Sequence, residues 1–285
     1  MISIPRRHLG KTGVQLSLIG MGGMTIKDEP QEKVDAFVHE SIEAGVNYFD
    51  VAPTYGTAEL KLGNSLKNTR GSVFLACKTI ARDKPGAWKE LNSSLQRLQT
   101  ERIDLYQLHG LSTEKDTETA LVKGGAVEAL VMARNEGLVK YLGFSAHSPA
   151  AALKAMREFD FDTILYPVNF VLHFRSDFEE AVLKEAKKRG MGILALKSMA
   201  KQIWPKDADR KQHSKCWYQP IDEPELAKLA LHWTLSQGVT AAVPPSDMRI
   251  YQDALKLVRG YRKLTAEEIS KLQMLAADLN PIFSV

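Results

Sequence analysis

Four side chains that can transfer or stabilise a proton follow three successive apolar segments of the chain. Asp50 and Tyr55 follow the first of these segments, Lys78 ends the second, and His109 ends the third. If the segments are neighbouring parallel strands, which lie about 4.8 Å apart, their carboxyl ends meet at one edge of a sheet. We therefore expect the four side chains to converge within about 10 Å.

This set of side chains suits proton transfer to a carbonyl oxygen. A lysine at the rim of an apolar sheet is costly to desolvate unless it is paired, and Asp50 is placed to pair with Lys78. The ammonium favours a phenolate, so we expect it to lower the pKa of Tyr55 from its reference value near 10. Tyr55 can then protonate a carbonyl oxygen that gains negative charge, while His109 hydrogen-bonds the same oxygen. The predicted reaction is reduction of a carbonyl by hydride, or oxidation of the alcohol.

Other interpretations of these strand-end residues remain open. A single tyrosine or histidine near a strand end is more often structural than catalytic, and Gln107, on the same strand face as His109, can simply fill polar space. Asp104 is expected to be structural because it lies at the opposite end of that strand. Lys78 could instead form a Schiff base, as in a lyase or aldolase, but that reaction needs a neutral amine and Asp50 favours the protonated form.

The composition indicates an ordinary globular protein. The 285 residues are 44% hydrophobic and 25% charged, which excludes a disordered, collagen-like or coiled-coil chain. The net charge of +4, from 38 basic and 34 acidic side chains, is too small and diffuse for a nucleic-acid-binding or membrane-surface protein. No apolar run reaches about 18 residues, and the start lacks the apolar core of a signal peptide, so we expect a soluble cytoplasmic protein. Cys77 and Cys216 are expected to be free thiols.

Eight short apolar runs alternate with amphipathic segments, which is typical of parallel strands joined by crossover helices. The predicted strands are Leu16–Gly20, Val46–Val51, Val73–Lys78, Ile103–His109, Tyr141–Ser145, Thr163–Val168, Gly192–Lys197 and Thr240–Val243. The predicted helices are Gln31–Ala44, Glu59–Leu66, Ala87–Leu98, Gly124–Glu136, Ala150–Glu158, Phe178–Arg189, Glu223–Ser236 and Ile250–Val258. Eight such units predict a closed α/β structure, a (β/α)8 TIM barrel, as a single domain over residues 1–285.

Two segments lie outside the repeat. Residues 1–15 contain the turn Gly10-Lys-Thr-Gly13 and predict an N-terminal hairpin that closes the bottom of the barrel. Residues Thr265–Leu279 predict an extra C-terminal helix that begins with a capping box. In a barrel the chemistry lies at the carboxyl ends of the strands, which is where the four side chains described above stand.

At four places the sequence resembles the aldo-keto reductase family. The matching stretches are Arg7–Gly13 with Leu16–Gly20, Gly45–Gly56 (GVNYFDVAPTYG), Cys77–Thr79 and Ile103–His109 (IDLYQLH). The second stretch resembles the highly specific family pattern G-x-N-x-F-D-T-A-x-x-Y-G, and the last resembles I-D-L-Y-x-x-H. The resemblance is spread over most of the chain.

The resemblance implies a role for each of the four side chains. Tyr55 is implied to be the general acid/base, Asp50 and Lys78 are implied to tune it, and His109 is implied to position the substrate carbonyl. The implied cofactor is NADPH, with NADH possible, and the implied substrate is a small aldehyde, ketone or alcohol. The oligomeric state and the particular substrate do not follow from the sequence.

The part of the chain that resembles the cofactor-binding half of the family is less regular. Where the family has Ser-Asn after the fifth strand, this chain keeps Ser145 but has Ala146, and Leu165 replaces a glutamine. These changes remove two polar contacts to a nicotinamide, each worth roughly 1 kcal/mol. They motivate a further alternative, a barrel that binds the nucleotide as a sensor or regulatory subunit and turns over little.

Phosphate contacts can compensate for the lost nicotinamide contacts. The loops after strands seven and eight are the usual phosphate-binding pair of this fold. Arg249 is suited to bidentate binding of a 2′-phosphate, which favours NADPH, whereas Asp247 nearby opposes a phosphate. The expected cofactor-binding residues are Gly22, Gly23, Asp50, Ser145, Lys197, Ser198, Ser246 and Arg249.

The loops expected to shape the substrate pocket are 24–29, 81–88, 109–125 and 200–221. The aromatic residues in or beside them predict a mostly apolar pocket: Trp88, Trp204, Trp217 and Tyr218. Of these, we expect Trp88 and Trp204 to contact substrate together with Tyr55 and His109. The stretch after the terminal helix is short, so we expect the pocket to be open or closed by the 200–221 loop. No spacing of histidine, cysteine or carboxylate residues indicates a metal site.

Overall fold

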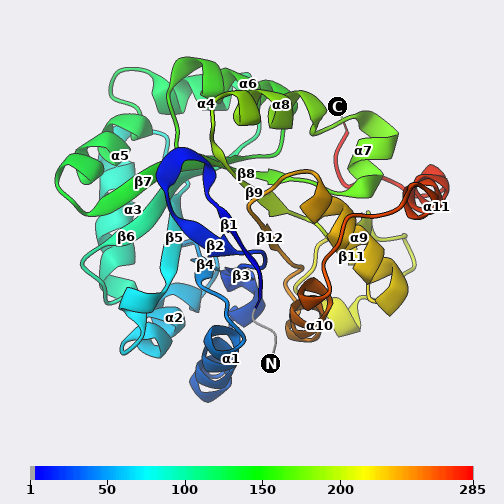
Figure 1. Cartoon of the computed structure of the whole chain (residues 1–285). Coiled ribbons are helices and arrows are strands. Elements are labelled where there is room, and N and C mark those ends of the chain that lie inside the picture. The colour runs from blue at the N-terminus through cyan, green and yellow to red at the C-terminus, as the bar shows by residue number, and fades with distance from the viewer. Residues whose placement is uncertain (1–3, 285) are drawn as a thin grey trace.

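The barrel is built from eight parallel strands in the order β12-β9-β8-β7-β6-β5-β4-β3. The computed structural model describes residues 4–284 (Figure 1). The sheet closes between its two ends because Gly20 N donates to Ala242 O at 2.9 Å and Ala242 N donates to Leu18 O at 2.8 Å. The predicted (β/α)8 barrel is therefore confirmed.

The strands of the barrel are short and almost completely buried. They are β3 (Met21–Gly22), β4 (Tyr48–Asp50), β5 (Phe74–Thr79), β6 (Ile103–Leu111), β7 (Val139–Ala146), β8 (Thr163–Pro167), β9 (Gly192–Leu196) and β12 (Ala241–Val243). Two antiparallel pairs lie outside the barrel: β1 (Arg6–His8) with β2 (Gln15–Ser17), and β10 (Ala200–Gln202) with β11 (Gln219–Pro220).

Eleven α-helices occur in the described chain. They are α1 (Gln31–Glu43), α2 (Ala58–Leu66), α3 (Lys84–Arg97), α4 (Glu114–Leu121), α5 (Ala126–Asn135), α6 (Pro149–Glu158), α7 (Phe170–Ser176), α8 (Glu180–Lys188), α9 (Pro224–Ser236), α10 (Met248–Arg259) and α11 (Ala266–Ala277). The short 3₁₀ helix η2 (Gly23–Ile26) follows β3. No helix within residues 4–284 is both long and apolar enough to span a membrane.

The N-terminal hairpin covers the bottom of the barrel, as predicted, and lies in front of the barrel strands in Figure 1. Its tip is the 3₁₀ turn η1 (Gly10–Thr12), and Leu9 beside it is fully buried in the interior cluster with Tyr48, Leu105 and Leu165. A Cβ atom at Gly10 would lie 2.4 Å from Gly190 O, so this close contact requires glycine.

One predicted strand needs correction, and two helices were missed. The first barrel strand is Met21–Gly22 rather than Leu16–Gly20. The start of the predicted strand belongs instead to the N-terminal hairpin, because Gln15–Ser17 pairs with β1. Helices α4 and α7 were not predicted. Each begins at a polar cap that the hydrophobic pattern does not reveal: Thr113 accepts from Asp116 N and Asn169 accepts from Leu172 N.

The structure places the eight predicted helices and the terminal helix close to their expected bounds. The terminal helix has the capping box, with Thr265 and Glu268 as its two partners. The outer core fills the space between strands and helices, and a separate smaller cluster fills the barrel interior. The carboxyl ends of the strands are thereby fixed from both sides, which positions the site.

Candidate active site

The carboxyl ends of β4 and β5 hold a buried ion pair. Lys78 Nζ contacts Asp50 Oδ1 and also donates to Val51 O at 3.2 Å. Asp50 is 3% exposed and Lys78 is 1% exposed, so both charged groups are desolvated. Their mutual attraction offsets the free-energy cost of that desolvation. The pairing predicted for these residues is confirmed.

The second carboxylate oxygen of Asp50 has two further donors that the sequence analysis did not assign. Gln107 Nε2 donates to Oδ2 at 3.0 Å, and Tyr48 OH donates to the same atom at 3.2 Å. Both residues point into the barrel because Tyr48 precedes Asp50 by two positions and Gln107 precedes His109 by two. This alternation of side chains along each strand is the sequence signal that could have identified Tyr48 and Gln107 as neighbours of Asp50. Gln107 therefore does more than fill polar space.

Tyr55 and His109 lie next to this ion pair. Lys78 Nζ is 5.2 Å from the centre of the Tyr55 ring, and the rings of Tyr55 and His109 meet edge to face with centroids 5.9 Å apart. The two rings are only partly buried, whereas Asp50 and Lys78 lie beneath them. The structure thus brings the four predicted side chains together at one end of the barrel.

The pKa values show how these charges act on one another. Burial lowers the pKa of Lys78, but Asp50 and Tyr55 together raise it more, so its pKa lies above the ordinary value and the amine stays protonated. Burial raises the pKa of Tyr55 above 10, while the Lys78 charge acts in the opposite direction. The expected lowering of the Tyr55 pKa is therefore wrong, because desolvation outweighs the ammonium.

His109 is an uncharged imidazole at neutral pH. Burial, together with the positive charge of Lys78, lowers the pKa of His109 to about 3. No group in residues 4–284 hydrogen-bonds its buried Nδ1. A neutral imidazole can donate or accept one hydrogen bond at each nitrogen, depending on its tautomer.

Two neighbouring residues of the site strands have structural roles. Cys77 is fully buried and points away from Lys78 into the outer core, as predicted, but its thiol also donates to Glu59 Oε1 at 3.2 Å. Asp104 lies at the opposite end of β6, where it accepts from Arg70 Nη2 at 2.8 Å and from Leu75 N at 2.9 Å. Asp104 is therefore structural, as expected.

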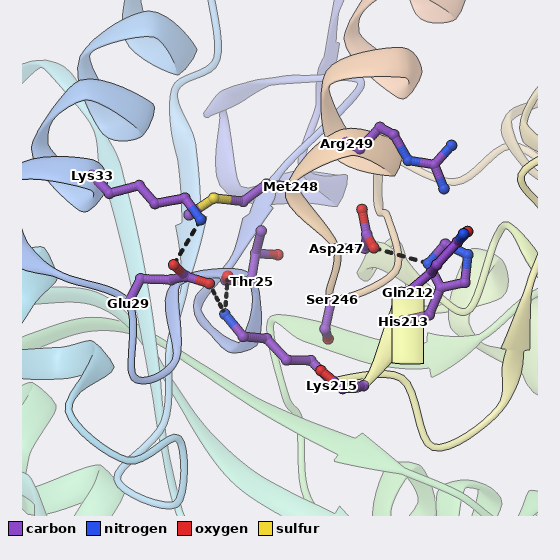
Figure 2. Close-up of a pocket in the computed structure, with 11 residues that line it drawn as sticks. Thr25, Glu29, Lys33, Gln212, His213, Lys215, Ser246, Asp247, Met248 and Arg249 are labelled. Atoms are coloured by element: carbon purple, nitrogen blue, oxygen red, sulfur yellow. Dashed lines mark hydrogen bonds and ion pairs between the residues drawn. The ribbon is translucent and has the colours of Figure 1, made fainter. Parts of the chain in front are cut away.

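A pocket of about 220 Å³ lies between η2, the 203–218 loop and the start of α10 (Figure 2). The 203–218 loop joins β10 to β11. Lys215 Nζ in this loop contacts Glu29 Oε1 at 2.6 Å and donates to Thr25 O at 3.0 Å, and Lys33 contacts Glu29 Oε2 at 2.8 Å. The two lysines lower the pKa of Glu29.

The opposite wall of the pocket is formed by the first turn of α10 and by His213. Asp247 caps the helix by accepting from Ile250 N at 3.0 Å, and its other oxygen contacts His213 Nδ1 at 2.8 Å. Arg249 lines the pocket, is 56% exposed, and lies 3.6 Å from Asp222. Both Asp247 oxygens are thus engaged, which reduces the repulsion expected between Asp247 and a phosphate.

Other expected cofactor residues lie around the barrel mouth. Ser198 is fully buried, and no described residue hydrogen-bonds its Oγ. Ser145 accepts from Gly110 N at 2.7 Å. Gly22 and Gly23 pack closely, because a Cβ atom at either would lie 2.8 Å from Val243 or Val51.

The nonpolar replacements in this region are both fully buried. Ala146 packs in the outer core, and Leu165 packs in the barrel interior next to Ser145 in the strand register. Neither side chain offers a polar atom to a nicotinamide.

The residues present fit a dinucleotide that carries phosphates. The pocket combines three cationic side chains with the N-terminal end of α10, where backbone N–H groups favour anions. Its volume is below that of most whole-ligand sites, so it accommodates one end of such a molecule. The unpartnered Ser198 hydroxyl supplies a further polar contact nearer the barrel strands.

Trp88 and Trp204, the two tryptophans expected to contact substrate, pack against other parts of the protein. Trp204 is buried in its own loop, where its indole donates to Cys216 O at 2.9 Å and its ring stacks on His213. Trp88 lies on α3 and packs against the outer core. The expectation that Trp204 contacts substrate is therefore not supported, because the indole is engaged within the loop.

The C-terminal stretch does reach the barrel mouth despite its short length. Phe283 stacks on His147 with ring centroids 5.2 Å apart and contacts Trp217 at 5.7 Å. The terminal stretch therefore meets the 203–218 loop through Trp217, so both segments lie at this side of the barrel mouth. No cluster of three potential metal ligands occurs within residues 4–284.

Comparison with known proteins agrees with this geometry. The sequence model described as the aldo/keto reductase family matches residues 18–277. The oxidoreductase YqkF of Bacillus subtilis (strain 168), itself called uncharacterized, is 26% identical over 302 residues, covering 94% of this chain and 95% of that protein.

Solved structures with the same fold include two aldo-keto reductases. The holo form of AKR11C1 from Bacillus halodurans superposes with a TM-score of 0.75 at 25% identity, covering 95% of this chain and 96% of that one. The thermostable Tm1743 superposes with a TM-score of 0.71 at 19% identity, covering 95% and 100%.

Proposed function

The chain belongs to the aldo/keto reductase family, which implies NAD(P)H-dependent oxidoreduction, and we propose that it reduces a small aldehyde or ketone with Tyr55 as the general acid. The reverse reaction oxidises the alcohol. The observation that carries this proposal is the contact chain from Asp50 through Lys78 to the Tyr55 ring, beside a neutral His109.

Tyr55 has the protonation state that reduction requires. Its raised pKa keeps the phenol protonated at neutral pH. When hydride reaches the carbonyl carbon, the oxygen gains negative charge and takes the phenolic proton. Lys78 then stabilises the phenolate, because its ammonium lies beside the ring.

Asp50 and His109 support this transfer in different ways. Asp50 keeps Lys78 protonated and fixed in position through their ion pair. His109, which is neutral, hydrogen-bonds the carbonyl oxygen without competing as an acid. The bound nicotinamide cofactor would supply the hydride.

The pocket of Figure 2 would hold the adenosine end of the cofactor, and Ser246 and Arg249, which line it, would bind its phosphates. Arg249 is mostly exposed, and its one ion pair within the described chain is with Asp222, at 3.6 Å. Its guanidinium therefore remains accessible to a 2′-phosphate. This supports NADPH as the preferred cofactor. We expect Gly22, Gly23, Ser145 and Ser198 to contact the part of the cofactor that lies between this pocket and Asp50.

The alternative functions lack such support. A Schiff base at Lys78 requires a neutral amine, and the raised pKa of Lys78 opposes it. A nucleotide sensor has no need of a proton donor held next to an ammonium at the barrel mouth.

Replacing Tyr55 by phenylalanine tests the proposal. Tyr55→Phe removes only the hydroxyl, so we expect kcat for aldehyde reduction, followed at 340 nm, to fall by roughly 100- to 10,000-fold. Titration of NADPH fluorescence should give nearly the same Kd for both proteins. Cofactor preference is read from kcat/KM with NADPH and NADH.

A matched control is Tyr141→Phe, which removes a phenol that hydrogen-bonds Thr12 O at the opposite end of the barrel. This variant should keep the wild-type kcat. Normal turnover by Tyr55→Phe would refute the assignment of the acid. Borohydride trapping of an adduct on Lys78 with an aldehyde would instead favour the lyase.

A further inference from the structure

Lys197 occupies a constrained position at the carboxyl end of β9. Its φ of +65° lies in the left-handed region that non-glycine residues rarely adopt. Two hydrogen bonds hold its carbonyl oxygen, from Asn169 Nδ2 at 3.2 Å and from Ala200 N at 2.9 Å. Backbone strain of this kind persists only where the surroundings fix it, and it often marks a functional site.

The ammonium of Lys197 is held by aromatic rings instead of by a carboxylate. Its Nζ lies 5.1 Å from the Trp217 ring centre and 4.7 Å from that of Tyr218. Within residues 4–284 no carboxylate lies within 4.0 Å of it. A partly buried cation without a counter-ion attracts an anion from solution, because its own desolvation is uncompensated.

The aromatic neighbours of this cation link it to the end of β7. Trp217, which lies beside the Lys197 ammonium, contacts Phe283, and the positive charge of Lys197 contributes to the lowered pKa of His147. Phe283 stacks on His147 and also contacts Trp217, which is 52% exposed. We call the group of Lys197, His147, Trp217, Tyr218 and Phe283 the mouth subsite.

The mouth subsite is separate from the pocket assigned to the cofactor phosphates. That pocket has its own cations, Lys33, Lys215 and Arg249, and Lys197 does not line it. Sequence position alone suggested that Lys197 binds phosphate, but its contacts with the rings of Trp217 and Tyr218, and the continuation of this aromatic group to Phe283 and His147, favour the substrate.

We propose that the mouth subsite binds a carboxylate of the substrate, with Lys197 as the cation and the aromatic rings as apolar walls. This inference rests on the proposed carbonyl reduction and deepens it. The preferred substrates are then aldehydes or ketones that carry a carboxylate on an aromatic or apolar frame, with the carbonyl directed towards Tyr55 and His109.

The charge of the subsite depends on pH in a way that can be measured. Burial lowers the pKa of Lys197 to about 8. The titratable groups around it stay neutral near that pH. The pKa values of His109 and His147 are lowered to about 3 and 4, that of Cys216 is raised to about 11, and burial raises that of Tyr218 well above 10. Above pH 8 the ammonium is lost, and carboxylate binding should weaken.

The kinetic test compares 4-carboxybenzaldehyde with its neutral methyl ester. We expect the wild-type protein to favour the acid at pH 7, and Lys197→Met to lower the acid-to-ester ratio of kcat/KM by about tenfold. In the wild type the same ratio should fall between pH 7 and pH 9. The control Lys201→Met removes a lysine of β10 that pairs with Glu223 at the start of α9. This variant should keep the acid-to-ester ratio within about twofold.

A binding test does not depend on turnover. Benzoate, but not benzamide, should quench Trp217 fluorescence saturably in the wild type, and Lys197→Met should abolish that quenching. Benzoate binding that persists in Lys197→Met would overturn the inference. An equal loss of kcat/KM for the acid and the ester in Lys197→Met, together with a raised Kd for NADPH, would also overturn the inference. That result would identify Lys197 as a phosphate ligand. Reduction of neither aldehyde would count against the proposed function, while benzoate binding still decides the carboxylate site.

Discussion

At the scale of single residues, the site depends on how one carboxylate is held. Asp50 receives Lys78 on one oxygen and both Gln107 and Tyr48 on the other. Hydrogen bonds to a charged group are stronger than those between neutral groups, so three donors fix this carboxylate firmly inside the barrel. The ion pair with Asp50 in turn fixes the position of Lys78, and the Tyr55 ring lies beside the Lys78 ammonium.

Gln107 is accordingly expected to be a positioning residue. Gln107→Leu removes one of the donors that hold the Asp50 carboxylate, so the ion pair with Lys78 and the Tyr55 ring beside it are held less firmly. A hydrogen bond to a charged group contributes about 1.5–3 kcal/mol, and we expect kcat to fall roughly tenfold. The KM for NADPH should not change.

Thr163→Val serves as the comparison for Gln107→Leu. It removes a buried hydroxyl that has no hydrogen-bond partner in the described chain, and it should leave both kcat and the KM for NADPH at the wild-type values. If Gln107→Leu shows the wild-type kcat, the amide only fills space.

At the scale of elements, the 203–218 loop is held at two places. Lys215 joins it to Glu29, next to η2, and His213 joins it to Asp247 at the start of α10. Both contacts border the pocket of Figure 2, so the loop position and the shape of the pocket depend on each other. Each ion pair of this partly exposed kind contributes little, typically 0.2–1 kcal/mol.

Glu29→Gln should loosen the loop without unfolding the barrel. It removes the charge partner of both Lys215 and Lys33, so we expect trypsin to cleave within 203–218 several-fold faster and the Kd for NADPH to rise a few-fold. Glu118→Gln, which removes an exposed partner of Lys115, is the matched control. Unchanged cleavage and unchanged Kd in Glu29→Gln would show that the ion pairs do not hold the loop.

At the scale of the whole molecule, stability should depend on the uncharged histidines at the barrel mouth. The pKa values of His109 and His147 are lowered to about 3 and 4, mainly by burial. Below their unfolded value near 6.5, the unfolded chain binds protons that the folded protein does not. The stability contributed by these groups is therefore complete above pH 6.5 and declines as the pH falls towards 4.

We expect the free energy of unfolding, measured with urea, to decrease between pH 6.5 and pH 5. The slope is at most about 1.4 kcal/mol per pH unit for each histidine, and smaller because both rings are partly exposed. His173 acts in the opposite direction, because its hydrogen bond with Glu179 raises its pKa. His147→Gln should reduce the slope, whereas His39→Gln, at an exposed position, should not. A flat profile in the wild type would contradict this expectation.

The sequence by itself determined the barrel and the positions of the four site residues. Apolar runs and glycines at helix ends, such as Gly45 and Gly137, depend on local backbone preferences and burial, which are encoded within a few residues. The strand ends then placed Asp50, Lys78 and His109 at one mouth, because parallel strands share a direction.

Only the tertiary structure decided how these groups act on one another. The raised pKa of Tyr55 depends on desolvation by distant segments, and the donors from Gln107 and Tyr48 depend on inward-facing positions across three strands. The contact between Phe283 and His147 joins residues that are 136 positions apart in the chain. Such long-range contacts depend on how the whole chain packs, which no local pattern of residues encodes.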